Sequence, residues 1–296
     1  MTLHQLVNWV LDKSRFNSLE DYSNFCKEYL SFIHDGLQAV IVSKNENIYQ
    51  FFQYKKDGNF NVSRPINSSL FLSSDNFDKD FSIFLKSLKN IKDIKGDKNA
   101  RELINSIVYT YQQSIGALLD ALPAGKSNFA RKLNGDLFER FILLLLERTG
   151  IHAVGGTINI PIEMNGQKLF DMKYQHDLIV KKDNEIRAIG SVKTSSKDRI
   201  DKIFIDKFLH NKLTDTNTPH FAIFLNDVQR KGTEKNYGIN TTFLTGHFKA
   251  YTVKLNPLDG VYYCDIRPNM KTEDVLKDNI RTLDHLLIED VWKFLI

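Results

Sequence analysis

Three acidic residues and a lysine in the second half of the sequence have the chemistry and spacing of a metal-dependent hydrolytic site. Fifteen residues separate Asp177 from Lys193, the length of an out-and-back hairpin, so the start of one strand should lie beside the end of the next. Asp206 follows Lys193 by thirteen residues on a predicted helix, and Glu139 lies on a predicted helix before the strands. We therefore expect these four side chains to meet at one edge of a sheet.

Carboxylates and an amine gathered in this way suit the hydrolysis of a phosphodiester. Carboxylate oxygens bind the hard cation Mg²⁺, which usually keeps several of its waters. The ion lowers the pKa of a bound water and neutralises charge that gathers on phosphorus. Lys193 is suited to orienting that water and holding the phosphate. The sequence predicts a Mg²⁺ cofactor and leaves open whether one ion or two are used.

A second set of charged residues follows the lysine directly. Lys197, Asp198 and Arg199 open a predicted helix and offer both signs of charge in consecutive positions. Lysine and arginine donate to guanine O6 and N7 in the major groove, and a carboxylate accepts from cytosine N4. These three residues are therefore predicted to read G·C base pairs in duplex DNA.

The elements that must position these residues can be predicted from periodicity and turn signals. A helix is predicted over 134–150, capped by Asn134 or Asp136 and ended by Gly150. Strands are predicted over 157–162, 168–174, 177–182, 185–194 and 220–227. Asp183-Asn184 forms a tight turn, and Ser195 or Ser196 caps a helix that runs to about Leu213. This order indicates an α/β fold with a mixed central sheet flanked by helices.

The first part of the chain shows no chemical motif. Helical spacing over 2–12, 18–35, 77–91 and 100–122, with strands over 38–43 and 47–54, predicts a mostly helical N-terminal region. A Pro- and Gly-containing segment, 123–128, breaks the pattern. We therefore place a boundary between an N-terminal region, 1–122, and a catalytic domain, 123–296. The N-terminal region is assigned to DNA grip, dimerisation or regulation.

Composition limits the class of protein. The chain has 296 residues and a formal net charge of +4, which is compatible with a polyanionic partner. Its two cysteines lie far apart, so a structural zinc site is not expected. The low number of cysteines indicates a protein of a reducing compartment. The longest apolar run, 141–146, is too short to cross a bilayer, and the N-terminus has no signal-peptide pattern. A soluble intracellular protein without a membrane partner is expected.

The charged constellation resembles the PD-(D/E)XK nuclease superfamily. In that pattern an aspartate is followed, on the next strand, by an acidic residue, any residue and a lysine; here the tripeptide is Ser191-Val192-Lys193. The EcoRII-like and CCGG-cutting branch of restriction endonucleases carries the missing carboxylate on the following helix, where this chain has Asp206. The stretch KTSSKDR (193–199) is similar to that branch's lysine followed by a basic-acidic-basic triplet. The resemblance covers about residues 134–227.

The resemblance implies a restriction-endonuclease-like core and assigns a role to each residue. Lys193 is catalytic, Asp177 and Asp206 are metal ligands, and Glu139 stands where the family places a further carboxylate. It implies a type II restriction endonuclease of the prokaryotic cytoplasm that cuts duplex DNA, with Mg²⁺, at a short palindrome containing adjacent G·C pairs. A palindrome matches two-fold symmetry, so a homodimer or a tetramer is expected.

Simpler explanations exist for each of these residues. Lys193 could be a surface lysine, Glu139 a helix charge beside Arg140, and Asp206 a partner of Lys202 or Lys207. Asp171 competes with Asp177, although it would need a longer connection to Lys193. Two other functions also stay open: a repair or modification-dependent endonuclease with the same site, and a catalytically inert DNA-binding protein with the same fold.

Overall fold

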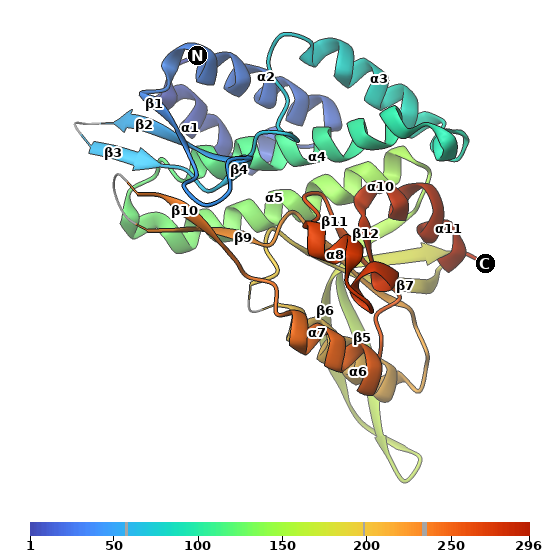
Figure 1. Ribbon diagram of the computed structural model, residues 1–296. Coiled ribbons are helices and arrows are strands. Elements are labelled where there is room, and N and C mark those ends of the chain that lie inside the picture. The colour runs from blue at the N-terminus through green and yellow to red at the C-terminus, as the bar shows by residue number, and fades with distance from the viewer. Residues whose placement is uncertain (57–58, 198, 233–235) are drawn as a thin grey trace.

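A computed structural model describes residues 1–56, 59–197, 199–232 and 236–296 of the chain. It contains a six-stranded sheet with helices packed on both faces, and a mostly helical layer built by the first 120 residues (Figure 1). The predicted base-reading Asp198 lies outside the described residues. Within the described ranges, no helix combines the length and the apolar character that a membrane crossing requires.

The N-terminal layer combines four helices with a small antiparallel sheet. Its elements are α1 (Leu3–Leu11), α2 (Leu19–Gly36), β1 (Ala39–Val42), β2 (Tyr49–Lys56), β3 (Asn59–Val62), β4 (Ile66–Asn67), α3 (Phe77–Lys89) and α4 (Lys98–Leu119). Short 3₁₀ turns lie at η1 (Lys13–Arg15), η2 (Asp93–Gly96) and η3 (Ala124–Lys126). α1 and α2 both begin with a capping box, at Thr2 and Ser18, which satisfies their first backbone N–H groups. The four predicted helices and the first two strands are confirmed.

The second half of the chain builds the main sheet. Its elements are α5 (Ser127–Arg148), β5 (Ala153–Met164), β6 (Gln167–Lys182), β7 (Glu185–Lys193), α6 (Ile200–Thr214), β8 (His220–Phe224), β9 (Val228–Lys231), β10 (Gly238–Thr241), α7 (Thr245–Lys254), β11 (Gly260–Tyr263), α8 (Pro268–Thr272), α9 (Leu276–Asn279), β12 (Ile280–Thr282), α10 (Leu283–His285), η4 (Leu286–Asp290) and α11 (Val291–Phe294).

The main sheet is mixed, as the sequence predicts. Its strand order is β12-β11-β8-β7-β6-β5, with antiparallel pairing from β5 to β7 and parallel pairing from β7 to β12. Asp183 and Asn184 both have positive φ, 52° and 66°, which is the tight two-residue turn expected between β6 and β7. Gly150 follows α5 at φ 86° and closes the helix. The predicted fold class is confirmed.

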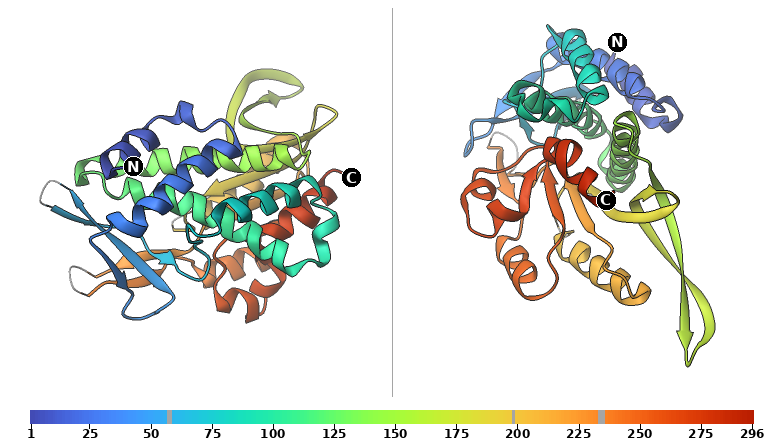
Figure 2. Two further views of the ribbon diagram at one scale, coloured as in Figure 1. Left: turned by 90° about the horizontal axis from the view of Figure 1, so that it is seen from above. Right: turned by 90° about the vertical axis from the view of Figure 1, so that its right-hand side faces the viewer.

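Two predicted boundaries are wrong. α5 begins at Ser127, and Asn134 does not cap it because Asn134 is buried and accepts hydrogen bonds from Gln112. The two strands predicted over 168–174 and 177–182 form one strand, β6, since β5 pairs with it along its length. The β5–β6 hairpin therefore extends as an arm away from the body (Figure 2).

The hydrophobic core runs through the molecule without a break at the predicted domain boundary. α5 is central because Leu137, Phe141 and Leu145 recur at helical spacing and all are fully buried. One buried cluster joins them to N-terminal residues such as Tyr22 and to strand residues such as Val192. The other face of the sheet packs against α6 and α7 in a second cluster. The division at 122/123 stays a prediction.

Gly190, near the centre of β7, lies where neighbouring side chains leave no room for a Cβ atom. A Cβ added there would lie 2.7 Å from Leu178 and 2.7 Å from Phe221. We expect Gly190→Ala to lower the free energy of unfolding by about 1–3 kcal/mol, because overpacking forces those side chains out of their preferred rotamers. Urea denaturation measures the change. Gly246→Ala on α7, where a Cβ meets nothing within 4 Å, is the control; equal stability of the two variants would contradict the prediction.

Candidate active site

The antiparallel pairing of β6 and β7 brings Asp177 and Lys193 together. Leu178 pairs with Gly190 in the register, so the residues beyond them continue side by side toward the end of β7. The carboxylate of Asp177 accepts a hydrogen bond from the backbone N–H of Val192, 2.9 Å away, and forms an ion pair with the Lys193 ammonium. Both contacts are made by the same oxygen, Oδ2, and the backbone bond holds the carboxylate beside the ammonium.

Glu139 approaches the same ammonium from α5. Its Oε1 lies 3.6 Å from Lys193 Nζ. Burial and, to a smaller extent, the negative charge of Asp177 together raise the pKa of Glu139 to about 7, although Lys193 partly opposes both. Lys193 therefore joins two carboxylates from different elements, and all three side chains stay about a quarter to a third exposed, at 28%, 23% and 32%. A plain surface lysine would not gather two such partners.

Asp206 reaches the same cleft from α6 but is held differently. Its Oδ1 accepts a hydrogen bond of 2.7 Å from the Tyr174 hydroxyl on β6. The suggested partner Lys207 is buried and bonds to Asp259 and to the Pro257 carbonyl. Within the described part of the chain, no ion pair joins Asp206 to Lys202. Asp171, the alternative to Asp177, lies on the exposed arm and pairs with Lys168.

One cleft of about 620 Å³ is lined by six of the seven predicted site residues. These are Glu139, Asp177, Lys193, Lys197, Arg199 and Asp206. The seventh, Asp198, is outside the described residues. The cleft also receives Arg131, Lys132 and Lys202, so its rim is strongly basic around an acidic centre. Such a cleft attracts a polyanion, and its acidic centre offers oxygen ligands to a cation.

The loop after Lys193 differs from the predicted cap. α6 begins at Ile200 with Arg199 in the N-cap position and no side-chain capping bond. Ser196 is buried, and its hydroxyl lies 3.3 Å from that of Thr242, while Ser195 Oγ accepts from the Lys197 N–H. Lys197 and Arg199 are both exposed. The buried Ser196 therefore anchors the loop, and the basic side chains of the loop face solvent at the cleft.

The donor set fits a hard divalent cation. Asp177 and Glu139 flank one ammonium, and the charge of Asp177 raises the pKa of Glu139, so the pair favours an added cation. Among the described residues, no three His, Cys, Asp or Glu side chains form a ready-made metal cage. Mg²⁺ does not need one, because it is often held by one or two carboxylates together with waters and substrate phosphates.

Several residues of the cleft were missed by the sequence prediction. Arg131 and Gly135 precede the predicted Glu139 at intervals of four on α5 and share its face, a signal that the sequence does contain. Gln229 comes from β9, a strand that was not predicted, and Tyr174 has no local signature. His176 on β6 also lines the cleft and is buried beside His210 on α6.

Comparison with solved structures assigns the architecture to a class: the chain has a restriction-endonuclease-like fold. The crystal structure of the type IIP restriction endonuclease Kpn2I superimposes with a TM-score of 0.71 and 20% sequence identity, covering 99% of this chain and 97% of that one. A complex of the restriction endonuclease PspGI with substrate DNA aligns with a TM-score of 0.38 and 12% identity, over 73% of this chain and 92% of that one. The sequence matches no family profile and no curated protein sequence.

Proposed function

We propose that this protein is a type II restriction endonuclease that hydrolyses duplex DNA with Mg²⁺ at a short palindrome containing adjacent G·C pairs. The observation that carries the proposal is the meeting of Asp177, Glu139 and Lys193 from three elements in a cleft with a basic rim. The shared fold with Kpn2I, described as a type IIP restriction endonuclease, supports the same class.

Each residue then has a defined part in cleavage. Asp177 and Asp206 would hold Mg²⁺, which would supply Lewis-acid chemistry and a more acidic bound water, and Glu139 would stand beside them as a further carboxylate. The Lys193 ammonium donates hydrogen bonds to the attacking water and to the scissile phosphate, and its position is fixed by the two carboxylates. Tyr174 orients Asp206 through its hydroxyl. Hydrolysis leaves a 5′-phosphate.

The exposed basic side chains at the start of α6 would provide sequence recognition. Lys197 and Arg199 line the cleft that holds the catalytic group, so recognition and cleavage share one element. Both donate to guanine O6 and N7 in the major groove. A palindromic target is cut on both strands by a two-fold symmetric homodimer, or by a dimer of dimers.

Digestion of plasmid DNA tests the proposed class. With Mg²⁺ we expect discrete fragments, and with excess EDTA none. Sequencing the fragment ends then gives the site, which should be palindromic and contain adjacent G·C pairs. A smear, or cleavage only of damaged or modified DNA, would favour a repair or modification-dependent endonuclease. Stable binding without cleavage in Mg²⁺ or Mn²⁺ would indicate an inert DNA-binding protein.

Glu139 should give the cleavage rate a pH dependence near neutrality. With its pKa near 7, the carboxyl is mostly protonated and uncharged at about pH 6 and mostly ionised at about pH 8. If only the carboxylate is active, the single-turnover rate rises about tenfold across this range. Because a bound cation lowers the pKa of a neighbouring acid, more Mg²⁺ should move the inflection to lower pH.

Two variants check the origin of this inflection. Glu139→Gln should cleave slowly with no inflection near pH 7. Glu147→Gln, at an exposed position on the same helix, should keep both rate and profile. An unchanged profile in Glu139→Gln would show that another group controls the pH dependence.

A further inference from the structure

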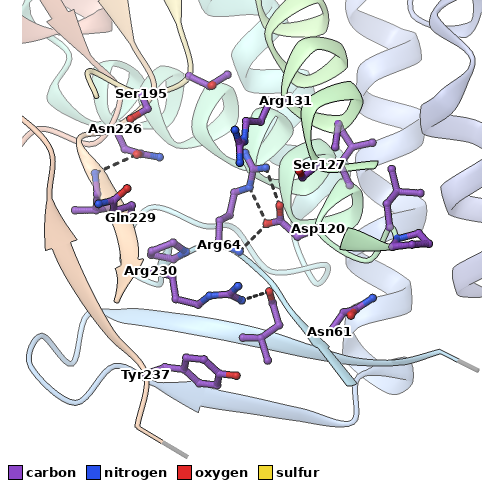
Figure 3. Close-up of a pocket in the computed structure, with 18 residues that line it drawn as sticks. Asn61, Arg64, Asp120, Ser127, Arg131, Ser195, Asn226, Gln229, Arg230 and Tyr237 are labelled. Carbon is purple, nitrogen blue, oxygen red and sulfur yellow. Dashed lines mark hydrogen bonds and ion pairs between the residues drawn. The ribbon is translucent and has the colours of Figure 1, made fainter. Parts of the chain in front are cut away.

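A second cleft, of about 610 Å³, adjoins the proposed catalytic cleft (Figure 3). It lies between the start of α5, the N-terminal sheet and β9, and it is no part of the catalytic constellation. Four residues line both clefts: Arg131, Thr194, Ser195 and Gln229. The two clefts therefore form one continuous groove that passes on both sides of the loop after Lys193.

The second cleft has a surplus of positive charge. Its single lining acid, Asp120, is used by Arg64 in a two-pronged ion pair with distances of 2.9 and 3.0 Å. Arg131 and Arg230 also line the cleft, and within the described residues neither forms an ion pair with an acid. An extended anion that enters the catalytic cleft therefore meets Arg131 at the junction and a further cation, Arg230, beyond it.

The side chains at the β9 edge are arranged to contact a ligand. Arg230 donates to the backbone carbonyls of Val62 and Ser63, and its guanidinium carbon lies 5.5 Å from the centre of the Tyr237 ring. These contacts orient the guanidinium and leave other N–H groups free to donate. In the part of the chain that the structure describes, the side-chain amide of Gln229 has no hydrogen-bond partner. A partly exposed amide at the junction of the two clefts is available to form hydrogen bonds with the edge of a base.

The length of α5 gives the distance between Glu139 in the catalytic cleft and Arg131 at the junction of the two clefts. Arg131 precedes Glu139 by eight residues on the same helix face, which corresponds to about 12 Å of helix. Base pairs in duplex DNA rise by about 3.4 Å each. The junction of the two clefts at Arg131 therefore lies about three or four base-pair steps from Glu139 along α5.

We propose that this second cleft binds the duplex beyond the cut phosphate and reads one more base pair there. Gln229 contacts the base edge, and Arg131 and Arg230 bind backbone phosphates. A glutamine amide matches adenine N6 and N7, so the pair that it reads is A·T. The inference rests on the proposed cleavage of DNA and deepens it, because it extends recognition beyond the G·C pairs assigned to Lys197 and Arg199.

The test uses duplexes that share the cleaved core, as found by end sequencing, and differ at one pair about three or four steps from the cut. The protein should cleave the A·T duplex roughly 10- to 100-fold faster than the others. Gln229→Ala should lose that preference. Gln229→Glu should move it toward C·G, because a carboxylate accepts from cytosine N4. Lys231→Ala, an exposed neighbour on β9 outside both clefts, is the matched control and should keep the A·T preference.

The outcomes separate this inference from the proposed function. Cleavage without an A·T preference, or with a preference that survives Gln229→Ala, overturns the inference and leaves the nuclease intact. If no DNA is cut at all, the nuclease proposal fails, and binding of a duplex of arbitrary sequence still tests the cleft. In that assay Arg131→Ala and Arg230→Ala should each reduce the slope of log affinity against log salt by about 1. An unchanged slope in both variants counts against the inference.

Discussion

Lys193→Ala is expected to reduce cleavage by on the order of 10³-fold, the usual effect of removing one preorganised donor to a transition state. The substitution removes the only ammonium that lies between Asp177 and Glu139 in the described structure. The two carboxylates then repel each other, and the pKa of Glu139 should rise further. Single-turnover cleavage at saturating enzyme measures this effect without a contribution from binding.

Binding and folding should survive the same substitution. Lys193 is 28% exposed, so its removal leaves no large buried cavity. The affinity for an uncut duplex that contains the target site, measured with Ca²⁺ in place of Mg²⁺, should change little. Several other basic residues line the cleft and still bind the DNA. Lys173→Ala, an exposed position on β6, is the control and should cleave normally. Cleavage by Lys193→Ala at the normal rate would reject the assignment of the active site.

The part of the site that the sequence predicts is the part that local rules determine. A hairpin of known length with Asp183-Asn184 at its turn has one register, and that register places Asp177 beside Lys193. Glu139 is assigned because the resembled family places a carboxylate there, on a helix whose many apolar residues predict that it packs in the core. Neither inference requires knowledge of a specific contact between residues that are far apart in the sequence.

The parts that were mispredicted depend on contacts between distant segments. Asn134 has the type of a cap but is buried against Gln112 of α4, and Ser196 is buried against Thr242. Strand β9 is short, and its Val228 packs against Phe51 of the N-terminal sheet. A sequence pattern shows what a residue prefers locally, and long-range packing overrides that preference wherever burial contributes more free energy. The second cleft could not be predicted because three separated segments form it.

A buried histidine cluster gives the second large expected effect. His176, His210 and His220 lie with ring centroids 5.2 to 6.3 Å apart, and each is at least nine-tenths buried. Burial, with a smaller contribution from the neighbouring imidazoles, lowers the pKa of His210 to about 4 and that of His220 to about 3. The cluster lies between β6, α6 and β8, beneath the Tyr174 that orients Asp206.

The sign of the resulting pH dependence follows from linkage. The unfolded chain binds protons at His210 and His220 below about pH 6.5, whereas the folded chain binds them only near about pH 4 at His210 and about pH 3 at His220. The stability that each neutral histidine contributes is therefore complete above pH 6.5 and lost as pH falls toward the folded pKa. At about pH 5 the loss is about 2 kcal/mol for each of His210 and His220, or about 4 kcal/mol for the two.

The charged groups around the cluster modify this effect without reversing its sign. The Lys207 ammonium opposes protonation of His220, and burial outweighs the charges of Asp177 and Asp206, which favour protonation of His176. Asp227 and Glu139, whose pKa values are raised to about 7, act in the opposite direction, because the folded state binds their protons first. The pH dependence of the wild-type stability therefore does not isolate the contribution of the histidines. The difference in stability between the wild type and a histidine variant does isolate it.

The double variant His210→Asn, His220→Asn isolates the contribution of the two histidines. Urea denaturation at about pH 7.5 should show it less stable than the wild type, because the rings pack closely. Between about pH 7.5 and pH 5 that difference should shrink by about 4 kcal/mol, since only the wild type loses the stability of the neutral rings. His247→Asn, an exposed ring on α7, should leave the difference from wild type almost constant with pH. A double variant that follows the wild type in parallel across this range would mean that the buried rings already carry protons in the folded state.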